Sequence, residues 1–159
     1  MDMPVIRAFG PDDLEWIVAT HARLYAEENG FDETFGLVVR QVAQAFLDRN
    51  DPREAGFVAV SGDRRVGSIL STRLDETTGQ VRLFLIEPEM RGTGLGPRLL
   101  AAAEDIARGQ GCVALKLWTH ESHRAACALY ARFGWTAGAG RPITNYGQPL
   151  VEMTWTKTL

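Results

Sequence analysis

The stretch QVRLFLIEPEMRGTGLGPRLLAAAEDIA, from Gln80 to Ala107, decides the expected fold of this 159-residue chain. Apolar residues from Val81 to Ile86 predict a strand, and Pro88 ends it because proline cannot donate to a sheet ladder. Three glycines follow within the turn Arg91–Gly96, and leucine and alanine then recur at helical spacing. The stretch therefore predicts a strand, a glycine-rich turn and an amphipathic helix in direct succession.

The turn from Arg91 to Gly96 has the properties of an anion-binding site. Glycines let the backbone approach a ligand closely, and the first N–H groups of the following helix have no intrahelical acceptor. A dinucleotide-binding GxGxxG needs glycine where Pro97 stands, and a P-loop needs Lys followed by Ser or Thr after its last glycine. Both are excluded by these residues. A turn without a ligand stays the open alternative at this point.

Length and composition predict one soluble domain, residues 1–159, with a single core. No apolar run approaches the roughly 20 residues of a membrane helix, so we expect no membrane association. No basic and apolar N-terminal segment indicates secretion, and Cys112 and Cys127 do not make a disulfide framework, so the expected location is cytoplasmic. A net charge of −3 without a Lys/Arg block argues against nucleic acid as a partner.

Periodicity and turn residues predict the order βααβββαβαββ, an α/β domain with a mixed, twisted sheet of about seven strands and helices on both faces. The strand at 112–118 should run parallel to the central strand, because a helix connects the two. The second helix should bury Phe35, Val38, Val39, Val42 and Phe46. The other expected elements are strands at 5–9, 57–61, 66–74, 135–137 and 150–157, and helices at 14–29, from near 32–34, and from 120–122 to 133. Asn29–Gly30 should end the first helix.

Two motifs at the expected positions make the chain resemble a known family. R-x-x-G-x-G, read at Arg91, Gly94 and Gly96, resembles the pyrophosphate-binding segment of GNAT-type N-acetyltransferases, which bind acetyl-coenzyme A. The last helix is similar to the family pattern N-x-x-A-x-x-L-Y-x-K-x-G-F, matched by His123, Ala126, Leu129, Tyr130, Arg132, Gly134 and Trp135. The resemblance covers nearly the whole chain. It implies the GNAT fold, acetyl-CoA as co-substrate and no metal.

Three further segments narrow the resemblance. LYAEENGFDETF, LWT and NYGQPLVEMTWT look like the acetyltransferase half of bacterial proteins that fuse a MarR-type winged helix to a GNAT domain. We expect no winged helix in this chain, and therefore no inherited DNA-binding activity.

The resemblance implies a set of coenzyme-binding residues. Backbone groups around Leu85 and Ile86 should hold the pantetheine arm, although their side chains suit a plain core equally well. His123 stands where the family has an asparagine that contacts pantetheine, and Tyr130 should lie near the coenzyme sulfur. Arg91 either pairs with a phosphate or lies on a solvated face. The turn and helix start should bind the pyrophosphate through Arg91, Gly92, Thr93, Gly94, Leu95 and Gly96.

Acetyl transfer to an amine requires an unprotonated amine and a proton for the departing thiolate. Tyr130 matches the family tyrosine assigned as general acid; a packing role with a hydrogen-bonded hydroxyl is the alternative. Glu28 is the candidate base, in the helix-loop-helix segment that borders the acceptor cleft in the family. Asp32 and Glu33 share that segment and Glu87 ends the central strand, yet such carboxylates are usually solvated, and a water chain serves equally.

The remaining candidate side chains have simpler interpretations. His21 falls on an apolar helix face and should be packed in the core, whereas His120 should be a cap or loop residue. No Cys/His spacing predicts a metal site, and neither cysteine has the surroundings of a nucleophile. Four aromatic residues either wall an acceptor pocket or fill the core: Phe31, Phe35, Trp118 and Tyr146.

Two functions stay open from the sequence. The first is an acetyl-CoA-dependent N-acetyltransferase in which the amine of a small molecule or peptide attacks directly in a ternary complex. The second is a non-catalytic acetyl-CoA-binding sensor or protein-interaction module. The acceptor, the pathway and the oligomeric state do not follow from the chain, and a homodimer is among the open states.

Overall fold

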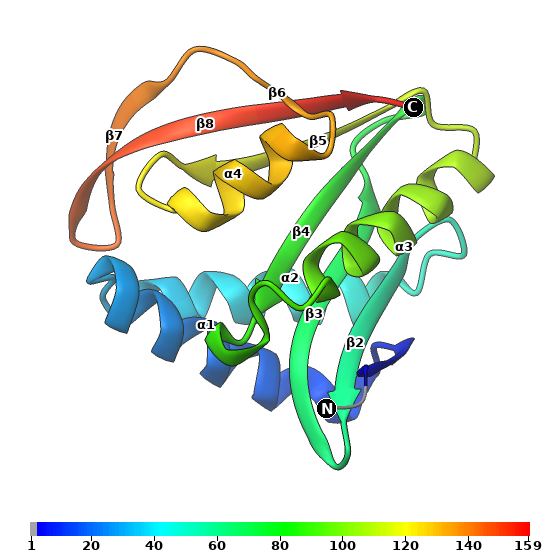
Figure 1. The fold of residues 1–159 in the computed structure, drawn as a ribbon, viewed down its shortest axis with the longest axis horizontal. Helices are drawn as coiled ribbons and strands as arrows, with labels where there is room; N and C mark the ends of the chain where they lie inside the picture. The colour runs from blue at the N-terminus through cyan, green and yellow to red at the C-terminus, as the bar shows by residue number, and fades with distance from the viewer. Residues whose placement is uncertain (1–2) are drawn as a thin grey trace. The chain divides into compact units, whose positions relative to one another are not determined.

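In the computed structural model, which describes residues 3–159, the chain forms eight strands, four α-helices and two short 3₁₀ helices (Figure 1). Hydrogen bonding orders the strands β1-β2-β3-β4-β5-β8-β6, with β7 paired to β8. The predicted α/β class and the element order through the last helix are confirmed. Beyond that helix the prediction of two strands was wrong, because three follow it.

The chain divides into two compact units. The first unit comprises Met1–Gly10, Asn50–Lys116 and Thr158–Leu159, and the second comprises Pro11–Arg49 and Leu117–Lys157. The single domain expected from the chain length stays a prediction. No helix within residues 3–159 combines the length and the apolar content needed to cross a membrane.

The first unit contains an antiparallel sheet of β1 (Val5–Ala8), β2 (Ala55–Ser61), β3 (Arg64–Arg73) and β4 (Thr78–Ile86). The strand β5 (Ala114–His120) begins in this unit and pairs parallel with β4, from Thr78 opposite Ala114 to Gln80 opposite Lys116. The predicted parallel connection is therefore confirmed.

The helix α3 (Leu95–Gly109) packs against β2, β3 and β4 of the same unit. The face of α3 that meets the sheet is fully buried at Leu99, Leu100 and Ala103. The Ser71 hydroxyl on β3 donates a hydrogen bond to the Ala103 carbonyl at 2.9 Å. The apolar face expected from the helical spacing of leucine and alanine is therefore confirmed, and Ile106 beside it is half-buried.

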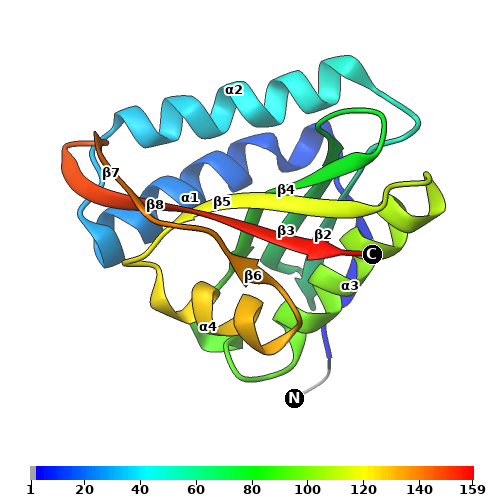
Figure 2. The same ribbon diagram turned by 90° about the horizontal axis from the view of Figure 1, so that it is seen from above.

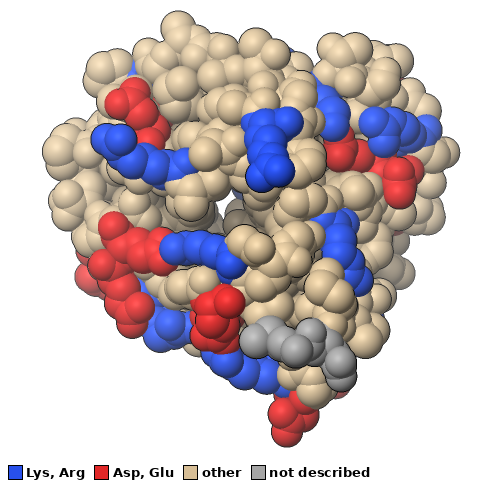
Figure 3. Space-filling model, in the orientation of Figure 1, with Lys and Arg blue, Asp and Glu red and all other residues tan. Residues whose placement is uncertain are grey.

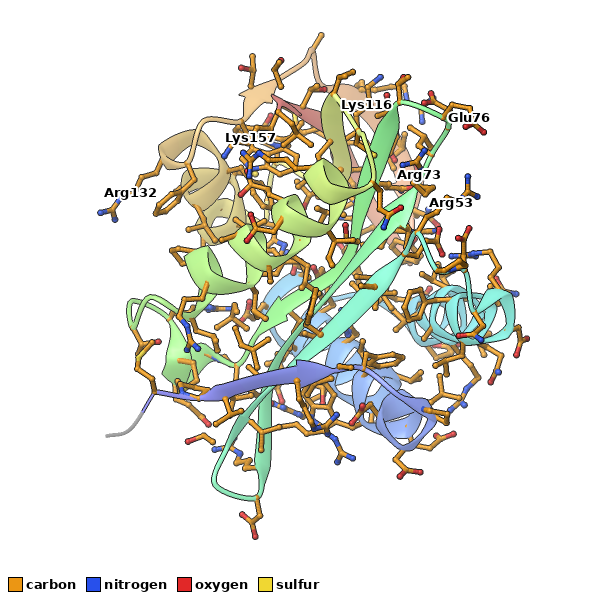
Figure 4. The ribbon with its side chains drawn as sticks, turned by 90° about the vertical axis from the view of Figure 1, so that its right-hand side faces the viewer. Arg53, Arg73, Glu76, Lys116, Arg132 and Lys157 are labelled. Atoms are coloured by element: carbon orange, nitrogen blue, oxygen red, sulfur yellow. The ribbon has the colours of Figure 1, made fainter. Side chains whose placement is uncertain are left out.

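Arg73 ties the turn between β3 and β4 to the end of α3. Its guanidinium donates to the carbonyls of Glu76 and Gln110, at 2.6 and 3.0 Å, and approaches the Cys112 sulfur at 3.1 Å. Arg73 and Glu76 lie close together at this end of the unit (Figure 4). Cys112 is buried in this network, so its role in the fold is structural packing.

In the second unit, α1 (Leu14–Asn29) and α2 (Thr34–Arg49) lie alongside each other, after a 3₁₀ turn at Pro11–Asp13 (Figure 2). Gly30 ends α1 in the left-handed region, with φ of 69°, as the Asn29–Gly30 stop signal predicts. Val39 is buried on α2, but the expected burial of Val38 was wrong, because its side chain is 37% exposed.

The rest of the second unit consists of the end of β5, α4 (Arg124–Arg132), β6 (Thr136–Ala137), β7 (Arg141–Asn145) and β8 (Gln148–Thr158). Strands β7 and β8 form an antiparallel hairpin whose two turn residues, Tyr146 and Gly147, both have positive φ. β7 escaped prediction because its sequence RPITN is short, exposed and contains proline. β5 runs two residues past the predicted end at Trp118, and α4 begins correspondingly later.

Charged side chains of both signs are interspersed on the face of the molecule seen in Figure 3.

Candidate functional site

The turn between β4 and α3 presents backbone N–H groups. After a 3₁₀ turn at Pro88–Met90, Gly92 and Gly94 adopt φ of 76° and 90°, in the left-handed region that favours glycine. Gly94 is the N-cap of α3 and supplies no side-chain hydrogen bond. Among residues 3–159, no acceptor is within hydrogen-bond distance of the N–H groups of Gly94, Leu95 and Gly96. Three consecutive donors at a helix start make an anion site.

The space in front of this turn fits a phosphate group. A Cβ added at Gly92 or Gly94 would meet no described atom within 4 Å, so the backbone there is open to a ligand. The Leu95 side chain is buried in the core, and the Thr93 hydroxyl donates to the Met90 carbonyl at 2.6 Å. Leu95 can therefore offer a ligand only its main-chain groups. Thr93 can offer its main-chain groups and a hydroxyl that also bonds the Met90 carbonyl. Arg91 is exposed beside them.

The end of β4 has an irregular backbone. Leu83 has φ of 48°, the register with β3 shifts between Ser68 and Leu70, and the Ser68 hydroxyl donates to the Leu83 carbonyl at 2.7 Å. The pairing with β5 ends at Gln80, whereas Leu85 and Ile86 pair with β3. The Leu85 side chain is buried, so only backbone groups at this position are available to a ligand, as the sequence analysis expects.

Glu87, at the end of β4, corrects the expectation that the candidate carboxylates are solvated. Its side chain is only 4% exposed, and its N–H donates to the Val66 carbonyl at 2.9 Å. Glu28 and Glu33, in contrast, are exposed in the second unit. Asp32 is also exposed, but its carboxylate accepts hydrogen bonds from the Thr34 N–H and hydroxyl at the start of α2. The four carboxylates therefore have different environments that their sequence context does not reveal.

Tyr130 lies on α4 in the second unit, with its side chain 4% exposed. Its ring packs between Trp135 and Trp155, with centroid distances of 5.8 and 5.7 Å. Burial raises the pKa of the Tyr130 hydroxyl well above its usual value, and the neighbouring Tyr25 and Cys127 add to that effect. The hydroxyl therefore keeps its proton across the physiological pH range.

The four rings of Tyr25, Phe31, Phe35 and Tyr146 form a packed aromatic cluster. Centroid distances are 4.5 Å between Tyr25 and Phe35, 4.9 Å between Phe31 and Tyr146, and 5.0 Å between Phe35 and Tyr146. These separations correspond to direct ring contact, so the rings fill the space between the α1–α2 loop and the β7–β8 turn. Trp118 was grouped with them in the sequence analysis, but its side chain is 42% exposed.

Hydrogen bonds hold the same two loops together. The Asp32 main-chain N–H donates to the Tyr146 carbonyl at 3.0 Å, and the Gln148 side-chain amide donates to the Gly30 carbonyl at 3.0 Å. The aromatic cluster is therefore held by both backbone and side chains.

His123 is the N-cap residue of α4, and its ring turns toward α1. The Tyr25 hydroxyl and His123 Nδ1 are 3.2 Å apart, and the two rings meet edge to face at 5.2 Å. Nδ1 is thus engaged within the second unit. The predicted coenzyme contact of His123 would have to use the other ring nitrogen.

His21 is buried in α1, as predicted, with 2% exposure. Its Nδ1–H donates to the Ile17 carbonyl at 2.7 Å, and burial lowers the pKa of the imidazole to about 4. The ring is therefore neutral near pH 7 and serves the core.

His120 differs from the expected cap or loop residue, because it is the last residue of β5 and its ring packs against the aromatic cluster. The ring meets Phe31 edge-on at 5.3 Å and Tyr146 at 6.4 Å. Its carbonyl does accept a hydrogen bond from the His123 N–H, so the main chain has the expected capping role. Burial lowers the pKa of the His120 imidazole, and Glu152 partly opposes that shift.

The second unit also contains an open pocket of about 670 Å³ that the sequence analysis missed, since its walls come from segments about 20 residues apart. The pocket is lined by Glu121, Ser122, Arg124, Pro142, Ile143, Thr144, Pro149, Leu150 and Val151.

In the described residues, no group of three or more His, Cys, Asp or Glu is arranged to hold a metal ion.

The predicted site residues divide between the units. Leu85, Ile86 and the turn Arg91–Gly96 lie in the first unit, and Glu28, His123 and Tyr130 lie in the second. Within the second unit the structure brings Tyr25 close to both His123 and Tyr130, a relationship that the sequence does not indicate.

Solved structures share this fold. A ribosomal-protein-alanine N-acetyltransferase from Brucella melitensis aligns with a TM-score of 0.79 at 18% identity, covering 98% of this chain and 99% of that one. A GNAT acetyltransferase from Elizabethkingia anophelis with acetyl-CoA bound aligns with a TM-score of 0.67 at 16% identity, covering 100% of both chains. At these identities the likeness shows the fold alone.

Sequence relatives show the family. A mycothiol acetyltransferase of Beutenbergia cavernae is 30% identical over 153 residues, which are 91% of this chain and 48% of that protein. An acetyltransferase of Agrobacterium fabrum is 37% identical over 112 residues, 70% of this chain and 77% of that protein. The chain spans about half the length of the first curated relatives that it matches. The family model described as "Acetyltransferase (GNAT) family" matches residues 18–135, so the chain belongs to the acetyltransferase (GNAT) family.

Proposed function

We propose that this chain binds acetyl-CoA and transfers its acetyl group to the amine nitrogen of a small molecule or peptide, by direct attack in a ternary complex. The start of α3 carries the proposal: the N–H groups of Gly94, Leu95 and Gly96 form no hydrogen bond among residues 3–159, and a Cβ added at Gly94 would meet no described atom within 4 Å. Membership in the GNAT family supports the same ligand.

The chain would hold the coenzyme mainly through its backbone. The helix start and Gly92 bind the pyrophosphate, Arg91 adds a positive charge, and main-chain groups near Leu85 and Ile86 bind the amides of the pantetheine arm. His123, whose Nδ1 lies 3.2 Å from the Tyr25 hydroxyl, is a further proposed contact of the coenzyme. The bound coenzyme supplies the thioester whose carbonyl carbon the amine attacks.

Tyr130 is the proposed general acid. As the carbon–nitrogen bond forms, the carbon–sulfur bond breaks, and its electron pair leaves on sulfur. Tyr130 donates its hydroxyl proton to that sulfur, and the nitrogen, positively charged once it is bonded to the carbonyl carbon, loses a proton to a base. Transfer of that proton through solvent to the Tyr130 phenolate restores the acid. The raised pKa ensures that the hydroxyl is protonated before the reaction. Burial of the same hydroxyl is also the observation that favours the second candidate, a non-catalytic acetyl-CoA-binding sensor or interaction module, in which Tyr130 only packs.

The acceptor class rests on the relatives' names and the sequence. One relative is named mycothiol acetyltransferase, and another is named N-alpha-acetyltransferase 30. An acceptor amine on either a small molecule or a peptide is therefore proposed. Four points stay predictions from the sequence. They are the narrower likeness to the acetyltransferase half of MarR–GNAT fusion proteins, the cytoplasmic location, the absence of metal, and an oligomeric state in which a homodimer is possible.

Ligand binding and thiol release test the proposal in two steps. Acetyl-CoA should raise the melting temperature, whereas NAD and ATP should not. Wild-type protein should then release free thiol from acetyl-CoA when given phenylethylamine, spermidine or a tripeptide with a free alanine N-terminus. Stabilisation without amine-dependent thiol release would support the sensor, and absence of stabilisation would overturn both functions.

A further inference from the structure

We propose that His120 is the base that takes the proton from the acceptor amine, an inference that rests on the proposed function. The acceptor arrives as a primary ammonium ion, and it must lose a proton before its nitrogen can attack a carbonyl. The amino-acid sequence alone does not indicate a histidine in this role.

The position of His120 leaves its ring available to a ligand. It is the last residue of β5, and its ring is half-buried against Phe31 and Tyr146. No group within residues 3–159 forms a hydrogen bond with either ring nitrogen. Of the three histidines, His21 is committed to the Ile17 carbonyl and His123 to the Tyr25 hydroxyl. His120 therefore presents a half-buried ring whose two nitrogens have no hydrogen-bond partner among residues 3–159.

The charges around His120 suit a base. Desolvation keeps the imidazole neutral near pH 7, so its lone pair can accept a proton. Glu152 on β8 attracts the imidazolium once it forms, and Arg141 on β7 holds that carboxylate at 2.8 Å. The third titratable neighbour is Tyr146, whose own pKa is raised by burial, so it stays neutral. The environment therefore favours proton uptake only when a proton donor is bound.

The carboxylates named in the sequence analysis are weaker candidates for the base than the His120 imidazole. Glu28 and Glu33 are exposed to solvent, so neither is held in a fixed position by burial. Asp32 is engaged in capping α2. A base is most effective when its pKa lies near the working pH, which imidazole approaches more closely than a carboxylate.

The surroundings also indicate the acceptor's charge. Glu152 places a negative charge near His120, which favours a primary ammonium over a neutral amide or alcohol. After transfer, the exposed side of the imidazole can release the proton to solvent.

Kinetics of His120→Gln provide the first test, with the amine from the panel that gives the fastest wild-type thiol release. Near neutral pH we expect kcat/KM to fall by about a hundredfold, the usual contribution of a base. The loss should shrink at alkaline pH, where the amine arrives unprotonated. Lys116→Gln, on the same strand, is the matched control and should keep wild-type kinetics. Stabilisation of both variants by acetyl-CoA should match the wild type.

Two further measurements separate a base from a packing residue. Added imidazole should restore turnover in His120→Ala, and it should not affect Tyr130→Phe. An NMR titration should find the His120 pKa below 6.5 and lower still in Glu152→Gln, which removes the opposing charge. These results would identify the ring as a neutral, exchangeable base.

The outcomes distinguish the two proposals. Near-normal kcat/KM of His120→Gln at neutral pH, with an active wild type, would overturn the role of His120 and leave the acetyltransferase function intact. A titration that found His120 charged at neutral pH would do the same. Wild-type protein that releases no thiol with any amine would overturn both.

Discussion

The two compact units present their candidate groups by different means. In the first unit, the turn Arg91–Gly96 and the end of β4 offer main-chain groups, while the Leu85 and Leu95 side chains are buried in the core. In the second unit the candidate groups are side chains, namely the phenol of Tyr130 and the imidazoles of His120 and His123. The candidate site of the first unit depends on backbone conformation, whereas that of the second unit depends on the surroundings of individual side chains.

This difference predicts opposite sensitivities to substitution. A backbone site depends on glycine where φ is positive, because any Cβ both strains the turn and occupies the ligand's space. A side-chain site depends on single functional groups and on the burial that sets their pKa values. Substitutions of each kind in each unit therefore test the comparison.

The largest effect is expected from Gly94→Val and Gly96→Val, which should abolish stabilisation by acetyl-CoA. At a ligand concentration about 100 times Kd, that stabilisation is worth about 2.7 kcal/mol. At position 94 the residue has φ of 90°, and the β-branched side chain would fill the space in front of the helix start. Thermal shift with and without acetyl-CoA measures the loss.

Gly109→Ala, at the other end of α3, is the matched control, since its Cβ would also meet no described atom within 4 Å and its φ is not positive. It should bind acetyl-CoA normally. A folded Gly94→Val protein with full stabilisation would place the coenzyme elsewhere.

The next effect concerns His21 and the acid stability of the second unit. The pKa of the imidazole is about 4 in the folded protein against 6.5 unfolded, so the unfolded chain binds more protons between these values. The free energy of unfolding should therefore fall by about 2 to 3 kcal/mol as pH drops from 6.5 to 4. His21→Asn should lack this part of the decline. Urea titrations across the pH range check it, and an unchanged acid slope in the variant would contradict it.

Tyr130→Phe should keep acetyl-CoA binding and lower kcat by about a hundredfold where chemistry limits turnover. The substitution removes only the hydroxyl, and the ring still packs between Trp135 and Trp155. A purely structural hydroxyl would instead cost about 1 kcal/mol of stability with near-normal kcat. Unfolding and single-turnover rates on the same sample discriminate, and full activity in a destabilised variant would rule out Tyr130 as the acid.

The smallest effect is expected from the exposed acidic residues. Neutralising Glu28, Asp32 and Glu33 together should raise KM or lower kcat for a cationic amine severalfold, because exposed charge pairs contribute up to about 1 kcal/mol. Asp32→Asn retains an acceptor for the Thr34 N–H, so α2 should stay capped. Steady-state kinetics measure the change, with Glu76→Gln as a remote control. Unchanged kinetics of the triple variant would remove Glu28 from the list of bases.

Local sequence signals were sufficient to predict most of the helices and strands. The Asn29–Gly30 stop, the glycine turn before α3 and the apolar face of α3 all appear as predicted, since each depends on residues within a few positions. β7 was missed because Arg141 and Pro142 give no strand signal. Its conformation depends on pairing with β8 across the Tyr146–Gly147 turn.

The candidate site was less predictable than the fold. Glu87 was expected in solvent and is buried, and His120 was expected in a loop and packs on Phe31. Neither environment follows from neighbouring residues in the chain, because the surrounding groups come from other elements. Phe31 is nearly 90 positions away from His120 in the sequence.

The sequence by itself determined where the backbone turns and which helix faces are apolar, since steric limits on φ and the 3.6-residue period act within one turn of chain. It thereby determined the N–H groups offered at Gly94–Gly96. Only the tertiary structure decided which side chains lose water: His21, Glu87 and Tyr130 are buried and His120 half-buried by residues distant in sequence. Desolvation depends on all neighbouring atoms in space, so proton affinities, and with them the proposed acid and base, emerge only when the chain is folded.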